Sequence, residues 1–181
     1  MNEFEFLAVL LSIVFGLALT QVLSGGIRLL YDHPIDDEKL AWALVLVTAL
    51  VVNWWGFFRW SNYEAWTFST YAFLMLWATS HFALATSLFP DTVGAEIDSS
   101  RAYRIFLIVF IGAILLDVAE GVLRKDVFAT PLYLPIMAHW ALLLFYRLLA
   151  APRPAVSRGI AWYIFVTMLA WSFLARRLLP G

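Results

Sequence analysis

The chain has 181 residues, of which 63% are apolar and only 14% are charged, and its formal net charge at pH 7 is −1. A soluble domain averages about 25% charged residues, and a small domain needs a polar surface because its surface-to-volume ratio is high. The composition therefore excludes a soluble globular enzyme and a disordered tail, and the lack of a basic excess excludes a nucleic-acid-binding module. The absence of cysteine excludes a disulfide scaffold, an iron–sulfur site and thiolate catalysis. The remaining class is an integral membrane protein in contact with the lipid bilayer.

Apolar stretches of the length that crosses a bilayer, about 20 residues, recur along the whole chain. We predict an all-α integral membrane protein, a single membrane domain over residues 1–181, with six transmembrane helices at residues 6–30, 40–60, 65–89, 102–123, 131–149 and 160–174. The connectors carry charges or turn-forming residues and are too short to fold alone. We expect the first apolar stretch to remain in the mature protein rather than to be cleaved as a signal peptide, because the chain opens with MNEFEF and lacks the basic segment of a signal peptide.

The basic residues give a small bias for orientation. Six spans place both termini on one side of the membrane, with five Lys or Arg residues on that side and seven on the other. By the positive-inside rule the termini lie outside the cytoplasm. The membrane that we expect is the inner, or plasma, membrane of a bacterium.

Small residues follow a four-residue spacing in the first span, at Ser12, Gly16, Thr20 and Ser24, with Gly25 beside them. Helices in lipid associate through close backbone approach and interhelical hydrogen bonds, because lipid tails are as apolar as leucine. This stripe therefore predicts a helix–helix contact.

The two halves of the chain share a pattern at a constant offset. Five residues of the first span recur 96 positions later in the fourth, as Gly16/Gly112, Leu19/Leu115, Val22/Val118, Gly25/Gly121 and Arg28/Arg124. A 3+3 inverted repeat, the architecture that places transporter sites near the bilayer midplane, is one explanation. Chance matching in a restricted alphabet is the other.

Ionisable or amide side chains inside a span are costly and therefore indicate a functional site. Asp117 lies about 9 Å inside the end of its span, at 1.5 Å per residue, and Asn53 and His139 are predicted at similar depth from the same side. These three residues are predicted to form one buried polar cluster, while His81 and Gln21 are predicted in the opposite half of the bilayer. An Asp–His pair can relay protons or hold a cation. It can equally form hydrogen bonds that stabilise the packing of helices against one another.

Glu120 and Arg124 follow Asp117 on the same helix face, in the favourable acid-first i, i+4 order. Because they come at the end of the fourth span, we expect both side chains to reach out of the bilayer to water.

Two classes of function agree with these features. The first is a channel or carrier for protons, an inorganic ion or a small solute, working as a homo-oligomer because six short helices barely enclose a pathway. The alternative is a structural or accessory subunit of a membrane protein complex. A bis-histidine haem held by His81 and His139 is less favoured, and no other cofactor is expected. An enzyme is not predicted, because the chain lacks zinc-ligand, phosphate-loop and nucleophile motifs.

Overall fold

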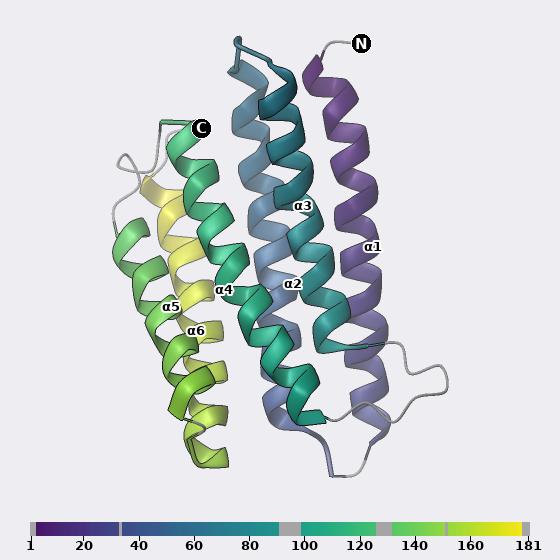
Figure 1. The fold of residues 1–181 in the computed structure, drawn as a ribbon, viewed down its shortest axis with the longest axis vertical. Coiled ribbons are helices and arrows are strands. Elements are labelled where there is room, and N and C mark those ends of the chain that lie inside the picture. Colours follow the sequence, from purple (N-terminus) through teal and green to yellow (C-terminus); the bar gives the residue numbers. More distant parts are fainter. Residues whose placement is uncertain (1–2, 33, 91–98, 126–131, 151, 179–181) are drawn as a thin grey trace.

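The structure, a computed structural model, describes residues 3–32, 34–90, 99–125, 132–150 and 152–178. These residues form only helices, in the order α1 (Glu3–Tyr31), α2 (Asp37–Phe57), the short 3-10 helix η1 (Phe58–Asn62), α3 (Phe68–Leu88), α4 (Ser99–Leu123), α5 (Tyr133–Ala150) and α6 (Pro154–Leu178). The long helices run alternately up and down, so that α1 begins and α6 ends at the same end of the bundle (Figure 1). We call this the upper end, as in Figure 1, and the opposite end the lower end. The prediction of an all-α fold is confirmed for the described residues.

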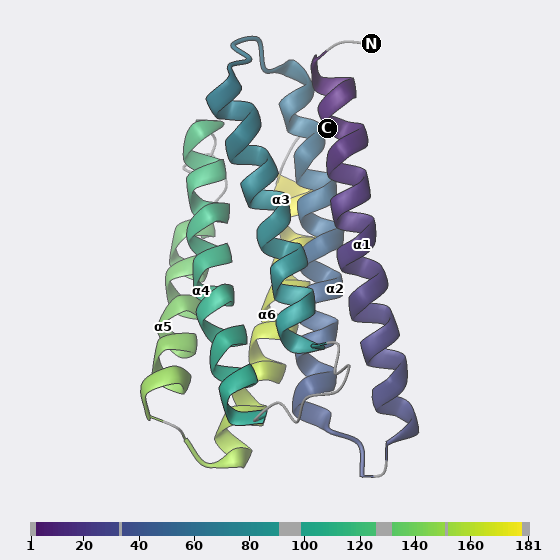
Figure 2. The same cartoon turned by 45° about the vertical axis from the view of Figure 1, so that its right-hand side comes forward.

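Five of these helices are long and apolar enough to cross a membrane, at Glu3–Tyr31, Asp37–Asn62, Ser100–Leu123, Tyr133–Ala150 and Pro154–Leu174. The chain is therefore a small multi-span helical membrane protein. Helix α3 is 21 residues long and carries no Asp, Glu, Lys or Arg, but its six Ser and Thr residues and His81 lower its mean hydropathy. It packs against α1, α2 and α4, and Figure 2 shows it between α4 and α1. That α3 also crosses the membrane remains a prediction.

Capping residues set two of the helix starts. Asp36 precedes α2 and its side chain accepts a hydrogen bond from the backbone N–H of Lys39 at 3.0 Å. Thr67 does the same for Thr70 at the start of α3, at 3.2 Å. Such caps satisfy backbone donors that the first turn of a helix leaves without partners.

The two halves of the bundle are packed differently. Helix α1 packs against both α2 and α3, whereas α4, its counterpart in the second half, packs against α3 and α5, and α6 packs against α2. The inverted repeat is therefore not shown by the arrangement of the helices.

The predicted small-residue stripe of α1 faces away from the bundle. Ser12 and Thr20 are exposed and donate their hydroxyl hydrogens to carbonyls of their own helix, at 2.6 and 2.8 Å. Gly16 has no atom within 4 Å of the position that a Cβ would occupy. By contrast, a Cβ on Gly25 would lie 2.2 Å from the ring of Phe89. Of these glycines, only Gly25 makes a close approach within one chain.

We expect Gly25→Ala to lower the free energy of unfolding by about 1–3 kcal/mol, because the added methyl group overlaps the Phe89 ring and forces it to move. Gly16→Ala is the matched control, in the same helix with open space around it, and it should not destabilise the protein. The measurement is SDS-induced unfolding of each purified variant in mild detergent. Equal effects at the two positions would show that the contact with Phe89 is unimportant.

Candidate functional site

A cavity lies inside the upper half of the bundle, bordered by residues of α2 to α6. It provides about 80 Å³ for the centres of water-sized molecules. A single water needs about 10–15 Å³ measured in this way, so the cavity has room for several waters. Most of its wall is aromatic or aliphatic, and its polar lining consists mainly of Asn53, Arg59, His81, Asp117, Glu120 and Arg124.

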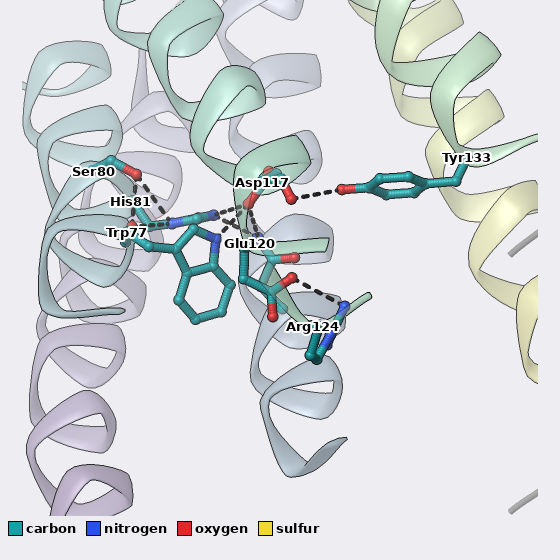
Figure 3. A network of polar contacts seen from close by, with 8 residues as sticks. Trp77, Ser80, His81, Asp117, Glu120, Arg124 and Tyr133 are labelled. Atoms are coloured by element: carbon teal, nitrogen blue, oxygen red, sulfur yellow. Dashed lines mark hydrogen bonds and ion pairs between the residues drawn. The ribbon is translucent and has the colours of Figure 1, made fainter. Parts of the chain in front are cut away.

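Three groups from two neighbouring helices converge on one carboxylate oxygen of Asp117 (Figure 3). Trp77 Nε1 donates to Oδ1 at 2.6 Å, Asn53 Nδ2 donates to it at 3.3 Å, and His81 Nε2 lies 3.7 Å away. The second oxygen, Oδ2, has no hydrogen-bond partner among the described residues, and Asp117 lines the cavity. One oxygen of this partly buried carboxylate, whose side chain is 21% exposed, is thus available to water or to a bound species.

The hydrogen bonds of His81 determine which of its ring nitrogens carries a hydrogen. Its Nδ1 lies 2.9 Å from the backbone oxygen of Trp77. A carbonyl can only accept, so Nδ1 carries the hydrogen. In the neutral ring, Nε2 then accepts from Asn53 Nδ2, which lies 2.5 Å away. Only 3% of His81 is exposed, and its ring packs against Phe15 and Trp77 with both centroid distances at 5.4 Å.

Glu120 and Arg124 form a second polar group beside Asp117. Arg124 Nη2 lies 3.0 Å from Glu120 Oε2, and Arg124 Nη1 donates to the backbone oxygen of Gly56 at 3.1 Å. The indole N–H of Trp60 donates to Glu120 Oε1 at 2.6 Å. The side chains of Glu120 and Arg124 are only 7% and 9% exposed, so they do not reach out to water as expected. The η1 helix and α2 cover this end of α4, and each makes one hydrogen bond with the pair in place of bulk water.

His139 and Gln21 lie apart from Asp117. His139 is exposed on α5, where its ring makes a T-shaped contact with Tyr163 at 5.5 Å. Gln21 donates from Nε2 to the backbone oxygen of Phe89 at 2.7 Å, near the lower end of α3. The structure thus brings Asn53, His81 and Asp117 together. His139 is not part of this cluster, contrary to the prediction, because the side of α5 that carries it is turned away from the bundle. Depth along a helix does not determine the direction in which a side chain points.

The two histidines do not fit a bis-histidine haem within one chain. His81 uses both ring nitrogens for contacts inside the bundle, whereas His139 lies on the outer face of α5. In the part of the chain that the structure describes, no group of three or more His, Cys, Asp or Glu residues is placed to hold a metal ion.

A second polar network, at the lower end, was not predicted. Glu38 of α2 accepts hydrogen bonds on Oε1 from the hydroxyls of Tyr103 on α4 and Ser157 on α6, the latter at 2.5 Å. Arg147 of α5 donates from Nε to the Ser157 hydroxyl, and its Nη2 lies 3.9 Å from Glu38. The network joins four helices. Its one sequence signal is that Glu38 and Arg147 have opposite charges and lie near span ends on the same side of the membrane.

Comparison of the chain with protein-family models, with curated proteins and with solved structures gives no match. The site combines a partly buried carboxylate, whose side chain is 21% exposed, with an oriented imidazole and a cavity of several water volumes.

Proposed function

We propose that the protein is a channel or carrier for protons or a small cation, and that Asp117 is the group to which the transported species binds. Two observations carry the proposal: Asp117 lines a cavity large enough for several waters, and its Oδ2 oxygen has no hydrogen-bond partner among the described residues. Carboxylates are rare inside membrane proteins because burying their charge is costly, and those that occur commonly mark ion pathways and proton relays. A proton or cation at Oδ2 offsets that cost.

The neighbours of Asp117 support exchange at this position. The indole of Trp77 and the amide of Asn53 are neutral donors, which hold the carboxylate in place without neutralising its charge. His81 is the nearest ionisable side chain, with Nε2 at 3.7 Å from Oδ1. An imidazole can accept a proton on one ring nitrogen while it donates from the other. Protonation at Nε2 turns this atom from acceptor into donor, which requires the Asn53 amide to present its oxygen instead.

We expect Asp117→Asn to lower proton flux into liposomes by about tenfold or more, because the amide keeps the size of the side chain but neither carries charge nor exchanges protons at neutral pH. The amide oxygen still accepts from Trp77, so the variant should fold. Flux is measured with a pH-sensitive dye trapped in the liposomes, and a parallel series uses sodium and potassium gradients. Asp37→Asn is the matched control, because this carboxylate lies on the surface, 49% exposed and 3.4 Å from Arg158.

The expected result is flux with the wild-type protein and the Asp37 variant and loss of flux with the Asp117 variant. Wild-type liposomes that leak no faster than empty ones in any of the gradients would refute the proposal. Wild-type rates with the Asp117→Asn variant would show that the pathway lies elsewhere.

The alternative function is that of a subunit in a membrane protein complex. It is favoured by the outward-facing stripe of Ser12, Gly16, Thr20 and Ser24, which leaves α1 open to the close approach of another helix. Because the chain contains no cysteine, a single Gly16→Cys substitution tests for contact between copies by disulfide-linked dimers in membranes. A protein that is inert in flux assays and co-purifies with one fixed partner supports the subunit function.

A further inference from the structure

A second cavity lies on the lower side of the bundle, bordered by α1, α3 and α4 and by Lys39 of α2, so that α3 and α4 border both cavities. It offers about 590 Å³ to the centres of water-sized molecules. Its lining includes the charged residues Arg28, Asp32 and Lys39 as well as Ser87 and Tyr103. The polar lining and the position at the lower end suit a water-filled entrance.

Only one helical turn on each helix separates the two cavities. On α4, Phe110 lines the upper cavity and Phe106 lines the lower one. On α3, Leu84 lines the upper cavity and Leu88 the lower one. All four side chains are at most 5% exposed. We call these four residues the apolar seal, because an apolar constriction of this kind blocks ions by excluding water.

Trp42 of α2 holds the aromatic part of the apolar seal in place. Its ring lies 5.4 Å from that of Phe106 and 5.6 Å from that of Phe110, between ring centroids, and is fully buried. Its indole N–H donates to the Tyr103 hydroxyl at 2.8 Å, and this hydroxyl donates to Glu38. The network around Glu38 therefore fixes the position of Trp42.

We propose that the two cavities are the two halves of one pathway along α3 and α4, that the apolar seal closes it in this structure, and that Trp42, fixed by Tyr103 and Glu38, keeps the seal closed. This inference rests on the proposed transport function, and it adds the second entrance and the barrier. It places Asp117 on the upper side of the barrier. Opening requires Phe106 and Phe110 to separate from Leu84 and Leu88.

The test measures water access with single cysteines, which the cysteine-free chain allows without background. Ala113→Cys lies in the upper cavity and Ala102→Cys in the lower one, both on α4. The reagent is 2-(trimethylammonium)ethyl methanethiosulfonate, whose permanent charge keeps it on the side of the vesicles to which it is added, and the remaining thiol is counted with a fluorescent maleimide after denaturation. We expect each cysteine to react only from its own side.

The apolar seal is then weakened by Phe106→Ala and Phe110→Ala. With either change, Ala113→Cys should also react from the lower side, at least about tenfold faster than before, because water enters the widened constriction. Phe57→Ala is the control, since Phe57 is equally buried but lies at the upper end against Phe4. This control should not change the side of the membrane from which Ala113→Cys reacts. If a phenylalanine variant does not fold, Trp42→Phe keeps an aromatic ring but removes the hydrogen bond to Tyr103 and part of the ring surface, and it should give a smaller change in the same direction.

The outcomes separate this inference from the proposed function, because cysteine labelling needs no transport. Unchanged sidedness in folded Phe106, Phe110 and Trp42 variants would overturn the apolar seal, even where flux depends on Asp117. A cysteine in the upper cavity that reacts from both sides in the wild-type background would overturn it as well. If the seal variants let the upper cysteine react from the lower side but the protein shows no flux, the apolar seal is supported and only the transport function is refuted.

Discussion

Arg124→Leu is expected to lower the free energy of unfolding by about 3–5 kcal/mol, because it leaves the buried carboxylate of Glu120 without the guanidinium that pairs with it. The ion pair is short, at 3.0 Å, and both side chains are nearly enclosed. Arg124 also donates to the backbone oxygen of Gly56, which loses this donor in the variant. The indole N–H of Trp60 remains on Glu120 but cannot balance a full negative charge.

Two further variants separate the charge effect from the effect of packing. Replacing Glu120 and Arg124 by leucine together removes both charges, and we expect it to cost much less than the single change. Arg158→Leu breaks an ion pair in which both side chains are 49% exposed, and it should cost less than about 1 kcal/mol. Reversible unfolding in mixed detergent and SDS measures all three. A single Arg124 variant as stable as the Arg158 variant would contradict the burial of this pair.

His81→Ala is expected to lower the free energy of unfolding by about 2–4 kcal/mol, whereas His139→Ala changes it by less than about 0.5 kcal/mol. Removal of the His81 ring leaves a hole beside Phe15 and Trp77 and removes one of the two hydrogen-bond partners of the Asn53 amide. His139 is exposed on α5 and loses only an edge contact with Tyr163.

The same unfolding assay compares the two histidine variants directly. Because both changes remove the same side chain from a long helix of the bundle, the difference between their effects reports the environment of each ring. Equal losses of stability would show that His139 is buried against a neighbour, as in a homo-oligomer. His81→Gln, which retains a side chain capable of hydrogen bonding, should recover part of the loss.

The positions of the helices follow from the apolar runs, but their ends do not. The second helix begins at Asp37 rather than at residue 40, because Asp36 caps a turn that extends beyond the hydrocarbon-length run. The third begins at Phe68 rather than at residue 65, because Thr67 is its cap. Hydropathy marks the part of a helix that suits lipid, whereas hydrogen bonds to capping side chains decide where the helix starts.

The candidate site was predicted in part. Asp117 and Asn53, which were grouped by depth, lie within hydrogen-bond distance. The histidine beside them is His81, which was predicted in the other half of the bilayer. Trp77 was not singled out, although its indole makes the shortest contact with Asp117. Its position four residues before His81 was the one available signal, because residues at this spacing share a helix face.

The amino-acid sequence by itself determined that this is a helical membrane protein and where its helices lie along the chain, and it predicts Asp117 as a charge placed well inside a span. These follow from properties that each residue has in its own right, such as the cost of burying a charge in lipid. Only the tertiary structure decided that His81 faces Asp117 while His139 faces outward, and that the small-residue stripe of α1 is exposed. In a soluble helix the polar face reveals which side meets water. A membrane helix is apolar on the lipid side and on the packed side alike, so its rotation is set by contacts with neighbouring helices.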